Sequence, residues 1–247
     1  QSTQGEVLLN ETSGRINAAG LLDITGIVLT LQGPISSSFN SNTSTAEVSL
    51  TAADAIDFGT QLEAHHDAQV LITYGGTMSM VDTLVDVGTL NIVGGHLTMG
   101  ATVDGVRRGA SVMAAKAIDI GLWGDLTIDP AVSLVASDQA SNIVIDVNSI
   151  DILGTVHAGA EIVDGSVRAS GNASTVRITA ADQISLGSRG QTTTAYAGVI
   201  RATGNITLNG GSGYGDTTYP GMGLWVDANS TVESLNVAEG ASALITL

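Results

Sequence analysis

Four aspartates recur inside a short signature that consists of an aliphatic residue, Asp, an apolar residue and Gly. The fourth copy has one extra residue before its Gly, and a fifth copy carries Ser185 in place of the aspartate. If the copies occupy equivalent places in successive turns of a repeat, neighbouring carboxylates stand about 5 Å apart up one face. The four aspartates are Asp57, Asp86, Asp119 and Asp151.

A column of carboxylates admits two interpretations. It could bind Ca²⁺, which prefers clustered carboxylate and carbonyl oxygens, and these four aspartates would then be the metal ligands. It could instead be a solvated acidic face that keeps molecules apart by charge repulsion. We favour the second interpretation, because the sequence has neither an EF-hand loop nor the Gly-Gly-x-Gly-x-Asp repeat of calcium-roll proteins. No other cofactor is predicted.

Two further clusters of polar residues could do chemistry. His65 and His66 lie near Glu63 and Asp67 and could hold a metal ion if the segment is looped, although a polar turn explains them better. The paired Arg107-Arg108, close to Asp104, could line the groove of an enzyme acting on acidic sugars. A turn that interrupts an acidic surface explains this pair at least as well, and no catalytic residue is predicted.

Three aromatic residues gather in or beside a Gly-rich segment late in the chain. Exposed rings there could stack on sugars or dock a neighbouring chain. Packing of the rings over the base of their own loop is the favoured interpretation. The three candidate binding residues are Tyr214, Tyr219 and Trp225.

The composition restricts both the fold and the partners. The 247 residues include 31 Gly, only 3% aromatic residues and no Cys, so the core must consist of aliphatic side chains between tight turns, without disulfides. The formal net charge of −16 disfavours nucleic acid and anionic membranes as partners. No apolar run approaches the roughly 20 residues that span a bilayer, so membrane insertion is not predicted.

The spacing of the signature indicates a repeat architecture. Its central positions, 57, 86, 119, 151 and 185, are separated by 29, 33, 32 and 34 residues. Thr51-Ala52-Ala53-Asp54 precedes the first copy and Thr179-Ala180-Ala181-Asp182 precedes the fifth. Another signature has Gly, a polar residue, Leu or Ile, Thr and an aliphatic residue, as in Gly95 to Met99 and Gly124 to Ile128. A third copy runs from Gly204 to Leu208.

Short alternating apolar segments of this kind are typical of strands, and no stretch keeps a helical period. Stacking of successive turns would pair each strand with its counterparts above and below. The sequence therefore predicts an all-β, right-handed parallel β-helix with about seven or eight coils of roughly 32 residues. We expect one column to hold Ile56, Val85, Ile118, Ile150 and Ile184.

Residues 1–247 are predicted to form a single β-helix segment. We expect it to be part of a longer solenoid, because the chain stops in an alternating strand pattern. Residues 33–44, rich in Ser and Asn, and residues 210–221, rich in Gly, Tyr and Thr, are predicted to be loops that protrude from it.

The two signatures quoted above resemble the repeats of filamentous-haemagglutinin-type exoproteins and autotransporter passengers, from about residue 45 to 210. The chain departs from this family because it has no Asn-Pro-Asn-Gly secretion motif near its start and no terminal run of membrane-barrel strands. The resemblance implies an interior segment of a large exported protein at the bacterial cell surface or outside the cell.

We therefore predict a non-catalytic structural or adhesive segment. Its expected partners are neighbouring solenoid coils, other copies of the chain, and host or surface glycans. Two alternatives remain open at this stage. One is a carbohydrate-active β-helix enzyme or polysaccharide-binding module, because this fold also serves such proteins. The other is a phage tail-fibre module, which would be an obligate trimer.

Overall fold

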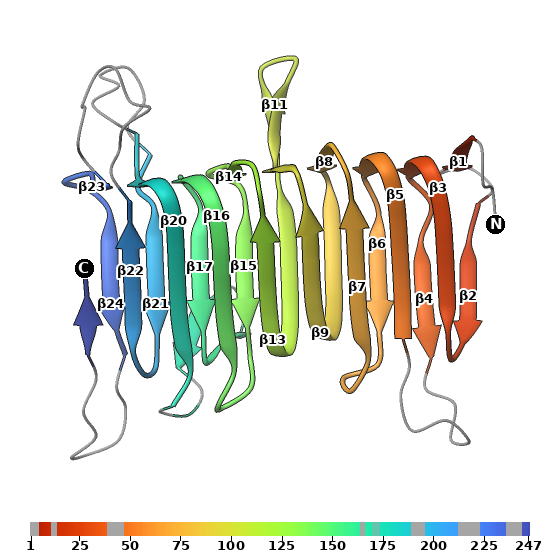
Figure 1. Cartoon of the computed structure of the whole chain (residues 1–247). Helices are drawn as coiled ribbons and strands as arrows, with labels where there is room; N and C mark the ends of the chain where they lie inside the picture. The colour runs from red at the N-terminus through yellow and green to blue at the C-terminus, as the bar shows by residue number, and fades with distance from the viewer. Residues whose placement is uncertain are drawn as a thin grey trace.

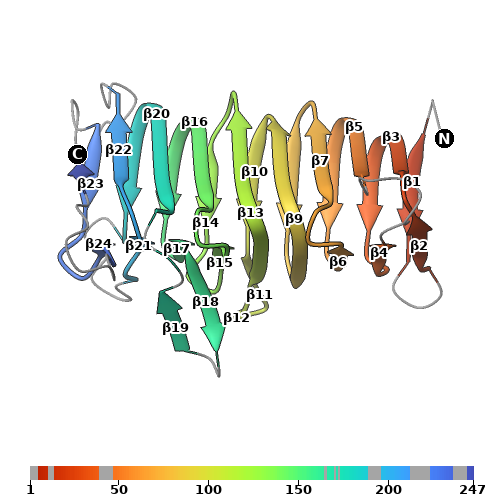
Figure 2. The same ribbon diagram turned by 90° about the horizontal axis from the view of Figure 1, so that it is seen from below.

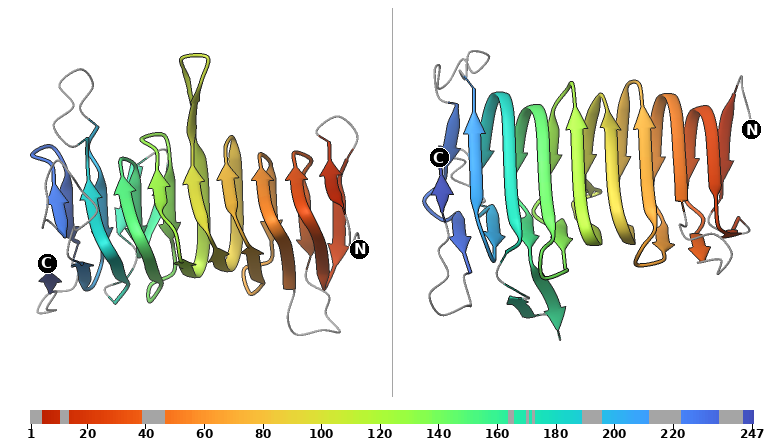
Figure 3. Two further views of the ribbon diagram at one scale, coloured as in Figure 1. Left: turned by 45° about the horizontal axis from the view of Figure 1, so that its top comes forward. Right: turned by 60° about the horizontal axis from the view of Figure 1, so that its bottom comes forward.

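The structure, a computed structural model, describes residues 5–10, 14–38, 47–163, 166–169, 171, 173–188, 196–211, 223–235 and 244–247. These residues form strands, turns and bends, with no helix among them. The chain winds as a parallel β-helix whose coils follow one another from one end of the molecule to the other (Figure 1 and Figure 3). Twenty-one strands join one hydrogen-bonded network. The all-β parallel β-helix predicted from the alternating pattern is confirmed.

The β-helix has three walls, and each wall is a parallel sheet of nine strands. Long strands bend and contribute one half to wall A and the other to wall B or wall C. Wall A contains the first halves of β3 (Leu22–Leu31), β5 (Glu47–Phe58), β16 (Asn142–Ile152) and β20 (Thr175–Leu186), the second halves of β9 (Thr83–Gly94) and β13 (Ala110–Leu122), and β7 (Gln69–Tyr74), β22 (Ile206–Gly210) and β25 (Ile245–Thr246).

Wall B and wall C complete each coil. Wall B contains β1 (Glu6–Leu9), the second halves of β3, β5, β16 and β20, and β8 (Thr77–Met80), β10 (His96–Met99), β14 (Leu126–Ile128) and β23 (Leu224–Val226). Wall C contains β2 (Ile16–Ala19), β4 (Ile35–Ser38), β6 (Gln61–Ala64), the first halves of β9 and β13, and β15 (Ser133–Ala136), β17 (Thr155–Ala158), β21 (Val199–Ala202) and β24 (Thr231–Ser234).

Side chains of like size stack inside the walls because parallel strands stay in register from coil to coil. On wall A, for example, each residue of the first inward-facing column pairs with an aliphatic residue at the same place in the next coil. Wall C instead places small residues in its second inner column, so that the interior narrows there. The wall A column consists of Leu22, Val48, Val70, Leu90, Ile118, Ile143, Val176, Ile206 and Ile245.

The coils are shorter and less uniform than the sequence suggested. The shortest steps, from Met78 to Leu97 on wall B and from Ile16 to Ile35 on wall C, are 19 residues. The longest, from Val156 to Ile200 on wall C, is 44 residues. The predicted coil of roughly 32 residues, repeated seven or eight times, is therefore wrong in detail: each wall carries nine strands. Coils of different length fit one stack because the extra residues leave at the corners.

The expected column of five aliphatic residues is only partly correct. Ile56, Ile150 and Ile184 do lie in one column of wall B. Val85 lies on wall C and Ile118 on wall A. The signature recurs on all three walls because each wall needs the same alternation of buried and exposed residues.

Two antiparallel hairpins leave the helix. The hairpin of β11 (Ala101–Val103) and β12 (Val106–Arg108) projects between walls B and C. The hairpin of β18 (Ala160–Val163) and β19 (Ser166–Ala169) projects between walls C and A (Figure 2). Neither hairpin was predicted. The predicted loop at 33–44 is wrong for residues 35–38, which form β4, and its residues 39–44 lie outside the described residues. In the loop predicted at 210–221, only Gly210 and Gly211 are described, and Gly210 ends β22.

A glycine in the neighbouring coil makes room for the buried ring of Tyr74. Tyr74 is 1% exposed, and it stands one coil below Gly94 on wall A, where Thr73 pairs with Val93. A Cβ atom at Gly94 would lie 2.4 Å from Cζ of Tyr74. Tyr74 can occupy this column only because Gly94 has no side chain.

We expect Gly94→Ala to lower the free energy of unfolding by about 1–3 kcal/mol, because the added methyl group displaces the Tyr74 ring. Combining it with Tyr74→Ala should cost less than the sum of the two single changes, since removal of the ring makes room for the methyl. Urea unfolding of all three variants measures this coupling. Gly121→Ala is the matched control, because nothing lies within 4 Å of its added Cβ atom. Strict additivity would show that ring and glycine do not share this space.

Candidate functional site

The four predicted aspartates do not form a column. Asp57 and Asp151 lie on the outer face of wall B, with Ser79, Thr98 and Thr127 between them. Asp86 lies on wall C and Asp119 on wall A. The expected ladder of carboxylates is wrong, because the copies of the signature occupy different walls. A Ca²⁺ site made of these four residues therefore has no geometric basis.

A different pair of carboxylates does stack. Glu63 on β6 and Asp86 on β9 are register partners on the outer face of wall C. Partial burial, together with the charge of Glu63, raises the pKa of Asp86, while His66 opposes the shift. Among the described residues, no group of three or more His, Asp or Glu side chains is arranged to hold a metal ion.

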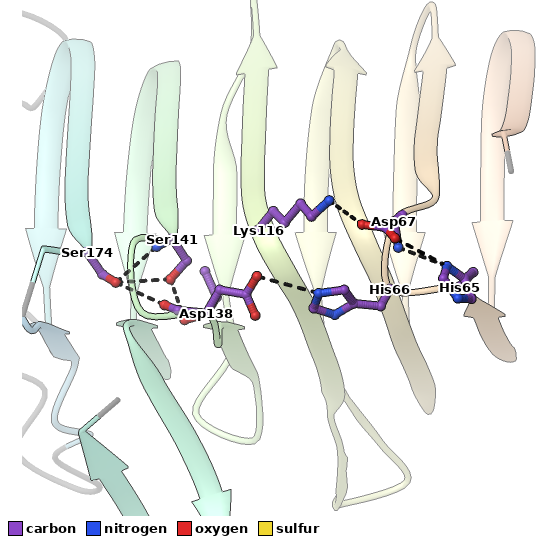
Figure 4. Close-up of polar contacts among 8 residues, drawn as sticks. His65, His66, Asp67, Lys116, Asp138, Ser141 and Ser174 are labelled. Carbon is purple, nitrogen blue, oxygen red and sulfur yellow. Dashed lines mark hydrogen bonds and ion pairs between the residues drawn. The ribbon is translucent and has the colours of Figure 1, made fainter. Parts of the chain in front are cut away.

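Polar contacts link several coils along the corner between walls C and A (Figure 4). Lys116 forms an ion pair with Asp67, and this lysine lowers the pKa of the Asp67 carboxyl group. His66 Nε2 lies 3.7 Å from Oδ2 of Asp138, and the Asp67 backbone N–H donates to His65 Nδ1 at 3.2 Å. The predicted polar turn at His65 and His66 is thus held by contacts with distant coils.

The same corner has an inner layer of hydroxyl groups. Ser141, Ser174 and Thr203 are all 0% exposed and follow one another in successive coils. Ser174 Oγ donates to the Asp138 carbonyl at 3.1 Å and accepts the Ser141 N–H at 3.0 Å. The Ser174 N–H donates to Thr203 Oγ1 at 3.3 Å. These hydroxyls satisfy backbone groups where the sheet bends, which is a structural task.

The paired arginines lie on the hairpin of β11 and β12. Arg108 donates to Oδ2 of Asp82 at 2.8 Å, and the Arg107 guanidinium lies 3.8 Å from the centre of the Tyr196 ring. Asp104 has a φ of 50° in the turn at the hairpin tip. Both arginines therefore contact the protein itself, one through an ion pair and the other through a cation–π contact.

Of the three candidate aromatic residues, the structure places one. Trp225 lies on β23 in register with Ser185, on wall B, and is half-buried. Tyr214 and Tyr219 lie outside the described residues, so a cluster of these rings stays a prediction. The structure also exposes an aromatic residue to which the sequence patterns assigned no role: Trp123, at the corner between walls A and B, is 63% exposed.

Polar side chains on the outer faces bond to one another between coils. Ser79 Oγ donates to Oδ1 of Asp57 at 2.8 Å. Arg177 makes two hydrogen bonds to the Asp146 carboxylate, at 3.2 and 3.1 Å. Each of these pairs joins neighbouring strands, so the polar surface reinforces the stacking of the coils. Other such pairs are Thr30–Glu6, Ser36–Asn17, Thr175–Asn142 and Arg201–Glu233.

Comparison with known proteins identifies no relative. No family model, no curated protein and no solved structure matches the chain. The likeness to exported bacterial repeats consequently remains a prediction from sequence. In the part of the chain that the structure describes, no helix is long and apolar enough to cross a membrane.

Proposed function

We propose that this chain is a non-catalytic scaffold segment of an exported bacterial surface protein, and that it presents adhesive surfaces outside the cell. The observation that carries the proposal is the continuous stack of nine strands on each wall around one aliphatic core. Such a stack is a stiff rod whose length grows with the number of coils. Its corners accept insertions without disturbing the walls, which suits the display of hairpins such as β11–β12.

The surface supports this role in a second way. Outer polar groups such as Asp57 and Asp146 make hydrogen bonds to the next coil, and an enzyme would instead need such groups directed at a substrate. The net charge of −16 also suits a surface that stays soluble and avoids nonspecific association.

Antibodies raised against the purified chain test the location. They should label intact, unpermeabilised cells of the producing organism, and labelling that requires permeabilisation would contradict the proposal. Incubation with a panel of acidic and neutral polysaccharides tests the absence of catalysis. Release of new reducing ends or of unsaturated products would favour the enzyme alternative.

We also propose that the chain associates end to end. Within the described residues, β1 at one end of wall B pairs only with β3, and β25 at the other end of the molecule pairs only with β22, so each keeps one unpaired edge. Unpaired edges can accept a strand from another molecule. Light scattering should give a mass that rises with concentration. A constant monomer mass at high concentration would contradict this association, and a constant trimer mass would favour a tail-fibre module.

A further inference from the structure

The exposed indole of Trp123 is fixed in place by the strand that precedes it. In β13, Ile118, Ile120 and Leu122 point into the core and are at most 6% exposed. Trp123 follows directly after β13, in the bend at the corner, and is 63% exposed. Its backbone N–H donates to the Gly94 carbonyl at 3.1 Å. A large apolar ring is thus presented to solvent from a rigid corner.

A notch lies beside this ring on the outer face of wall A. Gly121 is two residues before Trp123, near the end of β13, and alternates with the buried residues Ile120 and Leu122. Its register partners are Val93 below and Asp146 above, and an added Cβ atom would meet nothing within 4 Å. The gap therefore has Val93, 42% exposed, on one side and a carboxylate on the other.

Hydrogen-bonding groups lie on the other side of Trp123, at the start of the next strand. The Asp125 N–H donates to His96 Nδ1 at 3.1 Å, so a neutral His96 carries its proton on Nε2, which is then a donor. Asn148 Nδ2 donates to Oδ1 of Asp125 at 3.0 Å. These contacts, which join three coils, hold an imidazole, a carboxylate and an amide together at the corner, where Asp125 lies two residues after Trp123.

We infer that this corner, formed by Trp123, the Gly121 notch and the group of His96, Asp125 and Asn148, binds a neutral hexose unit of a glycan. The apolar face of a pyranose ring can stack on an indole. Its hydroxyl groups can donate to carboxylate and amide oxygens and accept from an imidazole N–H. The absence of a side chain at Gly121 lets the ring approach the sheet.

Charge decides which class of glycan fits. The Asp146 carboxylate beside the notch is paired with Arg177, but Asp119 lies on the same strand as the notch and Asp125 just beyond its end. The whole chain carries a net charge of −16. Uronate or sulfate groups would be repelled there, so the ligand is a neutral sugar. This inference rests on the proposed surface role, for which it names the ligand class at a site distinct from Trp225.

Titration of the purified full chain with neutral hexasaccharides of glucose, mannose, galactose and N-acetylglucosamine tests the inference. At least one should quench tryptophan emission and give a saturable isotherm by calorimetry, while oligogalacturonate should not. Trp123→Ala should weaken binding at least tenfold. Leu84→Ala, the control, removes a side chain that is 41% exposed on wall C and should leave binding unchanged. Gly121→Val, which fills the notch, should also weaken binding and serves if Trp123→Ala does not fold.

Three results would overturn the inference: no neutral hexasaccharide binds, only the anionic one binds, or Trp123→Ala binds as well as the unchanged chain. Equal loss of binding in Leu84→Ala would show that the effect is not specific to the Trp123 corner. A protein captured through Trp123 without competition by any sugar would likewise contradict a glycan ligand. Because the antibody experiment does not depend on sugars, labelled cells together with failed sugar binding would reject this inference alone.

Discussion

Ile143→Asp should abolish cooperative folding or lower the free energy of unfolding by more than about 4 kcal/mol. Ile143 is 0% exposed and stands on wall A between Ile118 and Val176 of the neighbouring coils. A carboxylate there would lie in the middle of an aliphatic column with no cationic partner, and burial of an unpaired charge costs several kcal/mol. Urea unfolding followed by far-UV circular dichroism measures the effect.

Val144→Asn is the matched control, because residue 144 is next in the same strand and faces outward between Asp119 and Arg177. It should change stability by no more than about 0.5 kcal/mol, as is usual for surface positions. Equal damage from both changes would mean that the two-residue alternation does not separate core from surface in this strand. Such a result would contradict the β-helix itself.

The alternation could be predicted because it depends only on strand geometry. A strand in a solenoid exposes every second residue whichever wall it occupies, so the apolar positions identify buried residues without knowledge of the coil. The register of Ile150 with Ile184, and of Leu97 with Leu126, follows the two signatures correctly. Gly204 to Leu208 breaks the second pattern, because Ile206 lies on wall A rather than wall B.

The coil length could not be read from the same patterns. Thr51 and Thr179 both occupy the outer face of wall A, and the sequence suggests four coils between them. The register takes five steps, through the four coils that contain Val70, Leu90, Ile118 and Ile143. Each coil has three similar strand segments, so one wall resembles the next. The spacing between two copies of the signature can therefore be one full coil or one coil plus one further wall, and the sequence does not distinguish the two.

The contacts along the corners could not be predicted from the sequence either. Lys116 meets Asp67 across 49 residues of sequence, and this pairing depends on how many residues leave the helix in the coils between them. The hairpin of β11 and β12 did carry a signal: Asp104-Gly105 is a two-residue turn sequence between apolar residues, and both of its residues have positive φ. The hairpin is an insertion that does not recur along the chain, so a search for periodic patterns does not detect it.

One buried histidine makes stability depend on pH. His157 on β17 is 1% exposed, and among the described residues neither of its ring nitrogens has a hydrogen-bond partner. It stands between Val135 and Arg201, its register partners on wall C. Burial, with a smaller contribution from Arg201, lowers the pKa of His157 to about 4.

The charged groups around His157 do not reverse this shift. Arg201 donates to Glu233 at 3.0 Å on the next coil, so its charge is partly balanced on the side away from the histidine. The neutral imidazole is therefore the form that the folded chain favours.

The unfolded chain, with a His pKa near 6.5, binds a proton more readily than the folded chain does. The contribution of the neutral His157 to the free energy of unfolding is therefore fully present above about pH 6.5, and it is lost as the pH falls toward 4. From pH 7.5 to pH 5 the loss should be about 2 kcal/mol. Urea unfolding at both pH values measures it, and pH 5 lies above the range where most carboxylates titrate.

His157→Val copies the residue that occupies the same place on the coil below, Val135, and should remove most of this difference between pH 7.5 and pH 5. His66→Gln is the control, because it also removes an imidazole, but one whose side chain is 57% exposed. Its stability should fall with pH as in the unchanged chain. If His157→Val kept the full pH dependence, another group would be responsible, and the imidazole would be solvated or paired in solution. If the variant lost stability equally at both pH values, the histidine would contribute through packing alone.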